Sequence, residues 1–289
     1  MTGLIVVGVD GSAPATAALD WASEEAACRG AALKIVNVRE PWTVAAPFFR
    51  AGTVDDSAAG YGPQTLEAAV RRAREHASAT EITTSLATGA VVERLRAESE
   101  GADELVIGSR GLGGFSGLVL GSVGLALAGH AAGPVVVVRT VARSVHGVIA
   151  VGFDGSEHSE AALEYAFTQA RRRGARLRAV YAWQMPMSSP YALGCSPVVE
   201  RVFQDEAAVA RQYLAPWREK YPDVEVEESA VCDHPIHVLS EESRRADLVV
   251  VGSRGLGGFS SAVLGSVSHG VLHRAHCPVA VVRPRKEER

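Results

Sequence analysis

The sequence predicts an α/β protein of two tandem Rossmann-like domains, each a five-stranded parallel sheet with helices on both faces. Two observations predict this fold. The chain repeats itself at an offset of 144 residues, which is the difference between Asp10 and Asp154 and also between Gly108 and Gly252. Within each repeat, short runs of branched apolar residues alternate with helical stretches, as in sheets buried on both faces. Solenoid units are several times shorter than this repeat, so each copy is expected to be a whole domain.

The size and charge of the chain suit two ordinary domains. It has 289 residues, of which 47% are hydrophobic, and we expect domains at residues 1–140 and 145–285. Each lies in the usual size range of roughly 100–150 residues. The 29 basic and 33 acidic side chains give a net charge of −4. No strongly basic surface is predicted, so nucleic acid is not an expected partner.

Cysteine usage and hydropathy favour a reduced, cytoplasmic protein. No apolar run reaches the roughly 20 residues of a membrane span, and no charged leader precedes the first apolar run. The cysteines form no paired motif; they are Cys28, Cys195, Cys232 and Cys277. We therefore expect cytoplasmic localisation and no membrane partner.

The first half of each repeat predicts a strand, a helix and a second strand. Residues 4–9 form an unbroken run rich in branched side chains, typical of a buried parallel strand. The run ends at Asp10-Gly11-Ser12, where Ser12 is a suitable N-cap for a helix over residues 15–29, and Gly30 ends that helix. Residues 33–38 are the second apolar run. A strand, helix and strand in this order indicate a right-handed crossover.

The second half completes the alternation after a long connection. Residues 40–63 and their counterpart 184–197 are rich in glycine, proline and small residues, so we expect loops there. The expected elements that follow are helix 65–79, strand 82–87, helix 91–99, strand 104–107, helix 122–130 and strand 134–138. In such a sheet, ligands bind beyond the carboxyl ends of the strands, where Asp10 and Gly108 both fall.

The glycine segment after the fourth strand predicts a phosphate site. Gly108 and Gly111 bracket a turn, nine residues follow, and Gly121-Ser122 opens a helix. Missing side chains let backbone N–H groups approach phosphate oxygens, and the helix start adds partial positive charge. The segment lacks the lysine of a P-loop and the third glycine of the dinucleotide fingerprint. Backbone amides do not read the base, so ATP, another adenine nucleotide and cyclic AMP all fit.

Each charged residue beside this segment has two candidate roles. Asp10 and Asp154 either close an Asx turn or contact the ligand. Arg110 and Arg254 either reach a phosphate or stay solvated. Histidines and a cysteine cluster in the second repeat, where a metal can be imagined, but the first repeat has no matching ligands; they are His269, His273 and His276, and Cys232, His234 and His237. We expect no metal site from them.

At these residues the chain resembles the universal stress protein family, in its tandem form. The family's ATP-binding branch carries Gly, two residues, Gly, nine residues, then Gly followed by Ser or Thr. The first repeat fits with Gly108, Gly111, Gly121 and Ser122; the second fits with Gly252, Gly255, Gly265 and Ser266. The resemblance extends to the opening Asp-Gly-Ser and the closing valine run, so it covers nearly the whole chain.

The resemblance implies an ATP-binding protein of the stress response with little or no hydrolysis, up to two ATP per chain, and strand order 3-2-1-4-5, as in adenine nucleotide alpha hydrolase-like folds. It implies Mg²⁺ or ribose near Asp10 and Asp154, and adenine near Val38 and Ala182. It also implies that the closing strands pair, giving a pseudo-dimer within one chain or a homodimer. The first site would include Gly8, Asp10, Val38, Gly108, Ser109, Arg110, Gly111, Leu112, Gly113, Gly114, Gly121, Ser122 and Val123. The second would include Gly152, Asp154, Ala182, Gly252, Ser253, Arg254, Gly255, Leu256, Gly257, Gly258, Gly265, Ser266 and Val267.

Two other functions remain open from the sequence. One is a weak ATPase or nucleotide-dependent enzyme of the same fold, in which Asp10 holds Mg²⁺. The Asp10-Gly11-Ser12-Ala13-Pro14 segment offers one glycine and a proline without an N–H, which counts against a pyrophosphate loop. The other is an interaction protein that binds no nucleotide and a protein partner of unknown identity.

Overall fold

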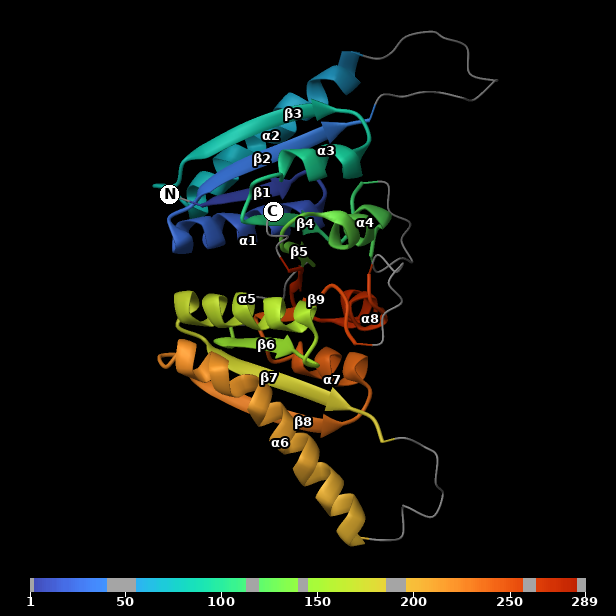
Figure 1. The fold of residues 1–289 in the computed structure, drawn as a ribbon. Helices are drawn as coiled ribbons and strands as arrows, with labels where there is room; N and C mark the ends of the chain where they lie inside the picture. The colour runs from blue at the N-terminus through green and yellow to red at the C-terminus, as the bar shows by residue number, and fades with distance from the viewer. Residues whose placement is uncertain are drawn as a thin grey trace, which may run out of the picture. The chain divides into compact units, whose positions relative to one another are not determined.

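The computed structural model describes residues 3–40, 56–112, 120–139, 145–185, 196–256 and 264–284, with side chains left out at 56–60 and 196–199. The chain forms two compact units, Met1–Val141 and Ala142–Arg289. In each unit, helices cover both faces of a parallel sheet (Figure 1). The α/β class predicted from the sequence is confirmed.

The first unit contains a five-stranded sheet in the order β3-β2-β1-β4-β5, and every neighbouring pair is parallel. Helices α1 and α2 pack together, as do α3 and α4 (Figure 1). The strands are β1 (Leu4–Gly8), β2 (Ala32–Arg39), β3 (Ile82–Thr88), β4 (Glu104–Gly108) and β5 (Val135–Val138). The helices are α1 (Ala13–Arg29), α2 (Asp56–His76), α3 (Val91–Glu98) and α4 (Ser122–His130).

The second unit repeats this arrangement with strand order β8-β7-β6-β9-β10, again parallel throughout. Its strands are β6 (Val148–Gly152), β7 (Arg176–Trp183), β8 (Val226–Cys232), β9 (Leu248–Gly252) and β10 (Val279–Val282). Its helices are α5 (Glu157–Arg173), α6 (Ser196–Lys220), α7 (Pro235–Glu242) and α8 (Ser266–Arg274). The strand order 3-2-1-4-5 is thus confirmed in both repeats.

The core of each unit comes from the apolar runs seen in the sequence. Ile5, Val6 and Val7 of β1 are fully buried, because helices cover both sheet faces. Helix α1 starts where the Ser12 hydroxyl accepts a hydrogen bond from the Ala15 N–H at 3.3 Å. It ends at Gly30, whose φ of 63° lies in the left-handed region that favours glycine. Both predicted helix ends are confirmed.

The predicted loop over residues 40–63 is wrong in its last part, because α2 begins at Asp56 and continues through Pro63. Glycine in this stretch serves close packing. A Cβ on Gly62 would lie 2.9 Å from a methyl group of Leu86 and 3.1 Å from the Asn37 side-chain oxygen. The counterpart loop ends at α6, which begins at Ser196. Residues 41–55 and 186–195 lie outside the described part of the chain.

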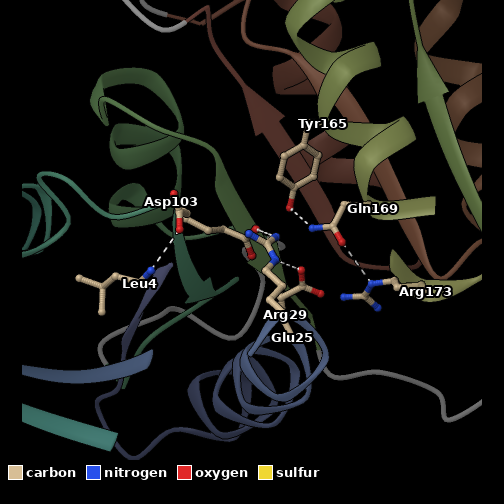
Figure 2. Close-up of polar contacts among 8 residues, drawn as sticks. Leu4, Glu25, Arg29, Asp103, Tyr165, Gln169 and Arg173 are labelled. Atoms are coloured by element: carbon tan, nitrogen blue, oxygen red, sulfur yellow. Dashed lines mark hydrogen bonds and ion pairs between the residues drawn. The ribbon is translucent and has the colours of Figure 1, made fainter. Parts of the chain in front are cut away.

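The two units differ in the polar contacts at one end of the first helix (Figure 2). In the first unit, Arg29 forms ion pairs with Glu25 on its own helix and with Glu104 at the start of β4; all three side chains are buried. In the second unit, the equivalent Gln169 side-chain amide receives a hydrogen bond from Arg173 at 3.4 Å and donates one to the Tyr165 hydroxyl at 3.0 Å. The glutamate of the first repeat, Glu25, therefore corresponds to the uncharged Gln169 in the second.

Candidate nucleotide-binding site

The Asp-Gly-Ser turn follows the first strand of each unit and forms an Asx turn. The Asp10 Oδ1 atom accepts a hydrogen bond from the Ser12 N–H at 2.9 Å, and Asp154 Oδ1 accepts one from the Ser156 N–H at 3.0 Å. Gly11, which lies between Asp10 and Ser12, has a φ of 85°, in the left-handed region that favours glycine. The Asx-turn role predicted for Asp10 and Asp154 is therefore observed in both units.

The same aspartates also hold the glycine segment. Asp10 Oδ2 accepts a hydrogen bond from the Leu112 N–H at 2.8 Å, and Asp154 Oδ2 accepts one from the Leu256 N–H at 3.0 Å. A Cβ on Gly111 would lie only 2.6 Å from Asp10 Oδ2. Each carboxylate therefore joins the end of the first strand to the turn after the fourth strand, using both of its oxygens.

The first glycine of the segment is required for packing of the strand against the helix. A Cβ on Gly108 would lie 2.7 Å from the carbonyl carbon of Pro14 and the backbone nitrogen of Ala15. A Cβ on Gly252 would lie 2.7 Å from the carbonyl oxygen of His158. Real Cβ atoms do not approach backbone this closely, so these two positions need glycine whether or not a ligand binds.

The last glycine of the segment opens the next helix. Gly121 donates its N–H to the Ser109 carbonyl at 2.8 Å, and Gly265 donates to the Ser253 carbonyl at 2.7 Å. Helices α4 and α8 begin directly after these glycines, and within the described residues neither N-cap makes a side-chain hydrogen bond. The first-turn N–H groups of both helices are therefore oriented for an anion.

In the second unit these elements surround one cavity of about 440 Å³. It lies at the carboxyl ends of β6, β7 and β9, against the start of α8. The predicted residues that line it are Gly152, Asp154, Ala182, Gly252, Arg254, Gly255, Leu256, Gly265, Ser266 and Val267. Ser253 is fully buried and is not among them. Gly257 and Gly258 lie outside the described residues.

Sequence reasoning missed about half of this lining. The additional residues are Phe153, Ser159, Val180, Gln184, His234, Pro235, Leu239, Val251 and Ser268. Val251 lies one residue before the end of β9, and Val180 lies three residues before the end of β7. His234 and Pro235 form the start of α7 and follow β8, so a rule that includes the first residues after every strand would have found them.

The predicted residues of the first unit occupy matching places. Gly8 ends β1, Val38 lies near the end of β2, and Ser109 is buried directly after β4. Arg110, Gly111 and Leu112 are exposed, and Ser122 and Val123 start α4. Gly113 and Gly114 lie outside the described residues. A cavity of about 300 Å³ in this unit lies between α1 and α2, where Thr16, Thr65 and Ala69 line it.

The histidines of the second unit have local roles. His234 Nδ1 accepts a hydrogen bond from the Ile236 N–H at 3.3 Å and so caps α7. His237 pairs with Asp233 at 2.6 Å, which lowers the pKa of that carboxyl. The ring centres of His269 and His273 lie 4.6 Å apart. Across the described residues, no group of three or more His, Cys, Asp or Glu side chains is arranged to hold a metal ion.

Arg254 and Arg283 place positive charge near the glycine turn of the second unit, beside His158. Burial lowers the pKa of His158, and the nearby Arg254 guanidinium lowers it further. Burial also lowers the pKa of Arg283, again with a contribution from Arg254. Positive side chains therefore gather behind the glycine turn of the second unit, where an anion would be favoured.

Among the described residues, no helix is long and apolar enough to cross a membrane. The sequence model of the universal stress protein family matches residues 1–139 and 147–283. This chain belongs to the universal stress protein family. The two matched segments fall in the two compact units, one in each.

Relatives of the same length support this membership. A universal stress protein of Mycobacterium tuberculosis strain H37Rv is 38% identical over 301 residues, covering 96% of this chain and 94% of the relative. One from Mycolicibacterium smegmatis is 36% identical over 290 residues, covering 97% of both chains. The crystal structure of a universal stress protein from Archaeoglobus fulgidus has a TM-score of 0.71 at 19% identity, covering 99% of this chain and 97% of that one. This last likeness supports the fold.

Proposed function

We propose that this universal stress protein is a regulatory ATP-binding protein, in which each unit binds one adenine nucleotide with Mg²⁺ and hydrolyses it slowly or not at all. The observation that carries the proposal is the cavity of the second unit. Ten residues chosen from the sequence for nucleotide binding line that one space of about 440 Å³. They combine an uncapped helix start, glycine backbone and an arginine, the features that bind phosphate in other folds.

Slow hydrolysis is supported by how the polar groups of the cavity are already used. Both oxygens of Asp154 accept backbone N–H groups. His234 Nδ1 also accepts a backbone N–H, so the neutral ring carries its proton on Nε2 and is a donor rather than a base. Among the described lining residues, no carboxylate or imidazole is therefore arranged to take a proton from an attacking water.

The test is the nucleotide content of freshly purified protein. Extraction by acid and chromatography are expected to give up to two ATP per chain. Gly111→Asp and Gly255→Asp are each expected to remove one, because each new carboxylate would stand against an existing aspartate and repel phosphate. The untouched unit is the internal control in each variant, and circular dichroism checks that the chain is folded.

Two results would overturn the proposal. An empty chain that also fails to bind added Mg·ATP would favour the interaction protein without nucleotide. Turnover well above about one per minute would favour the enzyme instead, since ordinary enzymes reach roughly 1–10³ per second.

The proposal also includes cytoplasmic localisation and association of two chains into a homodimer. Cell fractionation tests the first, and sedimentation of the full chain over a range of concentrations tests the second.

A further inference from the structure

In the second unit, Arg254 of the glycine turn contacts His158 of helix α5. His158 stands in the first turn of α5, and its Nε2 atom lies 3.1 Å from Arg254 Nε. Its Nδ1 atom lies 3.0 Å from the Ser253 hydroxyl. The two partners are adjacent in the chain and belong to the turn after β9, so one imidazole contacts both.

The chemistry of these contacts determines the proton on the ring. An arginine Nε–H only donates, so His158 Nε2 must accept and carry no proton. The proton of the neutral ring then lies on Nδ1, where it is donated to the Ser253 hydroxyl. The charges around the ring are Arg254 and Arg283, which disfavour protonation, and Glu157 and Asp154, which favour it. Burial adds to the first pair and keeps the ring neutral.

The contact with His158 fixes the position of the Arg254 guanidinium. With Nε occupied, Arg254 keeps its two terminal nitrogens for another acceptor. Arg254 is half-buried and lines the cavity beside Gly255 and Ser266. In the first unit, Pro14 stands where His158 would be, and Arg110 is exposed. Proline offers no side-chain acceptor, so the first unit lacks this way of holding its arginine.

We propose that His158 is a positioning residue for Arg254, and that the held guanidinium makes the second site select nucleotides by their terminal phosphates. The inference rests on the proposed nucleotide binding and deepens it. A guanidinium already held in place loses less conformational freedom when it binds phosphate, so it contributes more to affinity.

The test uses calorimetry on the full chain carrying Gly111→Asp, so that the second site alone binds. Arg254→Ala is expected to weaken ATP binding by about tenfold or more, and AMP binding clearly less, because a charged hydrogen bond to phosphate is lost. His158→Ala is expected to weaken ATP binding about three- to tenfold in the same direction. His158→Gln is expected to restore most of it, because a side-chain amide oxygen accepts the Arg254 Nε–H.

The matched control uses Gly255→Asp to isolate the first site. There, His158→Ala is expected to leave ATP binding unchanged, because Pro14 stands at the corresponding position of the first unit.

The outcomes separate this inference from the proposed function. If ATP binds but His158→Ala leaves its affinity unchanged, the positioning role is wrong and nucleotide binding stands. If Arg254→Ala weakens ATP and AMP equally, or His158→Gln behaves like His158→Ala, the selectivity or the acceptor role is overturned. If the parent chain binds no nucleotide at all, the proposed function and this inference both fail.

Discussion

The two units share one backbone design but stabilise it with different side chains. Strand register matches residue for residue at the 144-residue offset: Leu33 pairs with Ile82 as Leu177 pairs with Val226. The hydrogen bonds of Asp10 and Asp154 to the glycine turn are also the same. The cores of the two units differ, because the first unit buries an ion-pair network and the second packs aromatic rings. The shared part holds the candidate site, and the differing parts lie in the support behind it.

The largest difference between the units is expected at Arg29. Replacing it by methionine leaves the buried carboxylates of Glu25 and Glu104 without this cation, which is expected to cost about 3–5 kcal/mol of unfolding free energy. Hydrogen exchange of β1 and β4 peptides should quicken while β6 and β9 peptides change little.

Arg173→Met is the matched control, since Gln169 and Leu248 stand in the second unit at the positions of Glu25 and Glu104. Equal destabilisation by the two substitutions would contradict the idea that these two carboxylates account for the loss in the first unit.

A second large effect is expected in the aromatic core of the second unit. Phe167 is fully buried and stacks on Tyr221, with ring centres 5.2 Å apart, and on Trp217 at 6.0 Å. Phe167→Ala should lower the stability of this unit by about 3 kcal/mol, because it leaves a cavity among rings that cannot close it. Denaturant unfolding with tryptophan fluorescence measures the loss.

The first unit supplies the comparison, because the place of Phe167 is taken there by buried Ser23, which donates to the Leu19 carbonyl at 2.7 Å. Ser23→Ala should cost much less than Phe167→Ala. A comparable loss would mean that the aromatic rings add little to the second unit.

The sequence predicted what repeats and missed what joins distant elements. The strands, the Ser12 cap and the start of α4 follow from local patterns, and all were placed within a few residues. The start of α2 was missed because Gly62 and Pro63 read as chain breakers, whereas Gly62 meets Leu86 in three dimensions. The contact of His158 with Arg254 joins residues 96 positions apart, so no local pattern shows it.

The shared part of the units is expected to respond equally. Asp10→Ala and Asp154→Ala each remove two hydrogen bonds to backbone N–H groups. Each should cost about 1–3 kcal/mol and loosen the glycine turn of its own unit. Asp→Asn at either position should cost less, because the amide keeps one accepting oxygen. Hydrogen exchange at the Leu112 and Leu256 amides tests this. A large difference between the two exchange rates would show that Asp10 and Asp154 do not stabilise their glycine turns equally.

The smallest difference is expected in the response to acid. The pKa of His158 is lowered from its usual 6.5 in the folded chain, so below about pH 6.5 the unfolded state binds a proton that the folded state resists. Stability from the neutral ring is then complete above pH 6.5 and decreases as pH falls toward the folded pKa. His158→Gln has no proton to bind, so its unfolding midpoint in denaturant should fall less than that of the parent chain between neutral pH and mild acid. The first unit has Pro14 at this position, and exchange of its β1 peptides should show no difference between the two proteins. Parallel pH profiles for the parent and His158→Gln in the second unit would mean that burial and the nearby Arg254 do not keep His158 neutral in the folded chain.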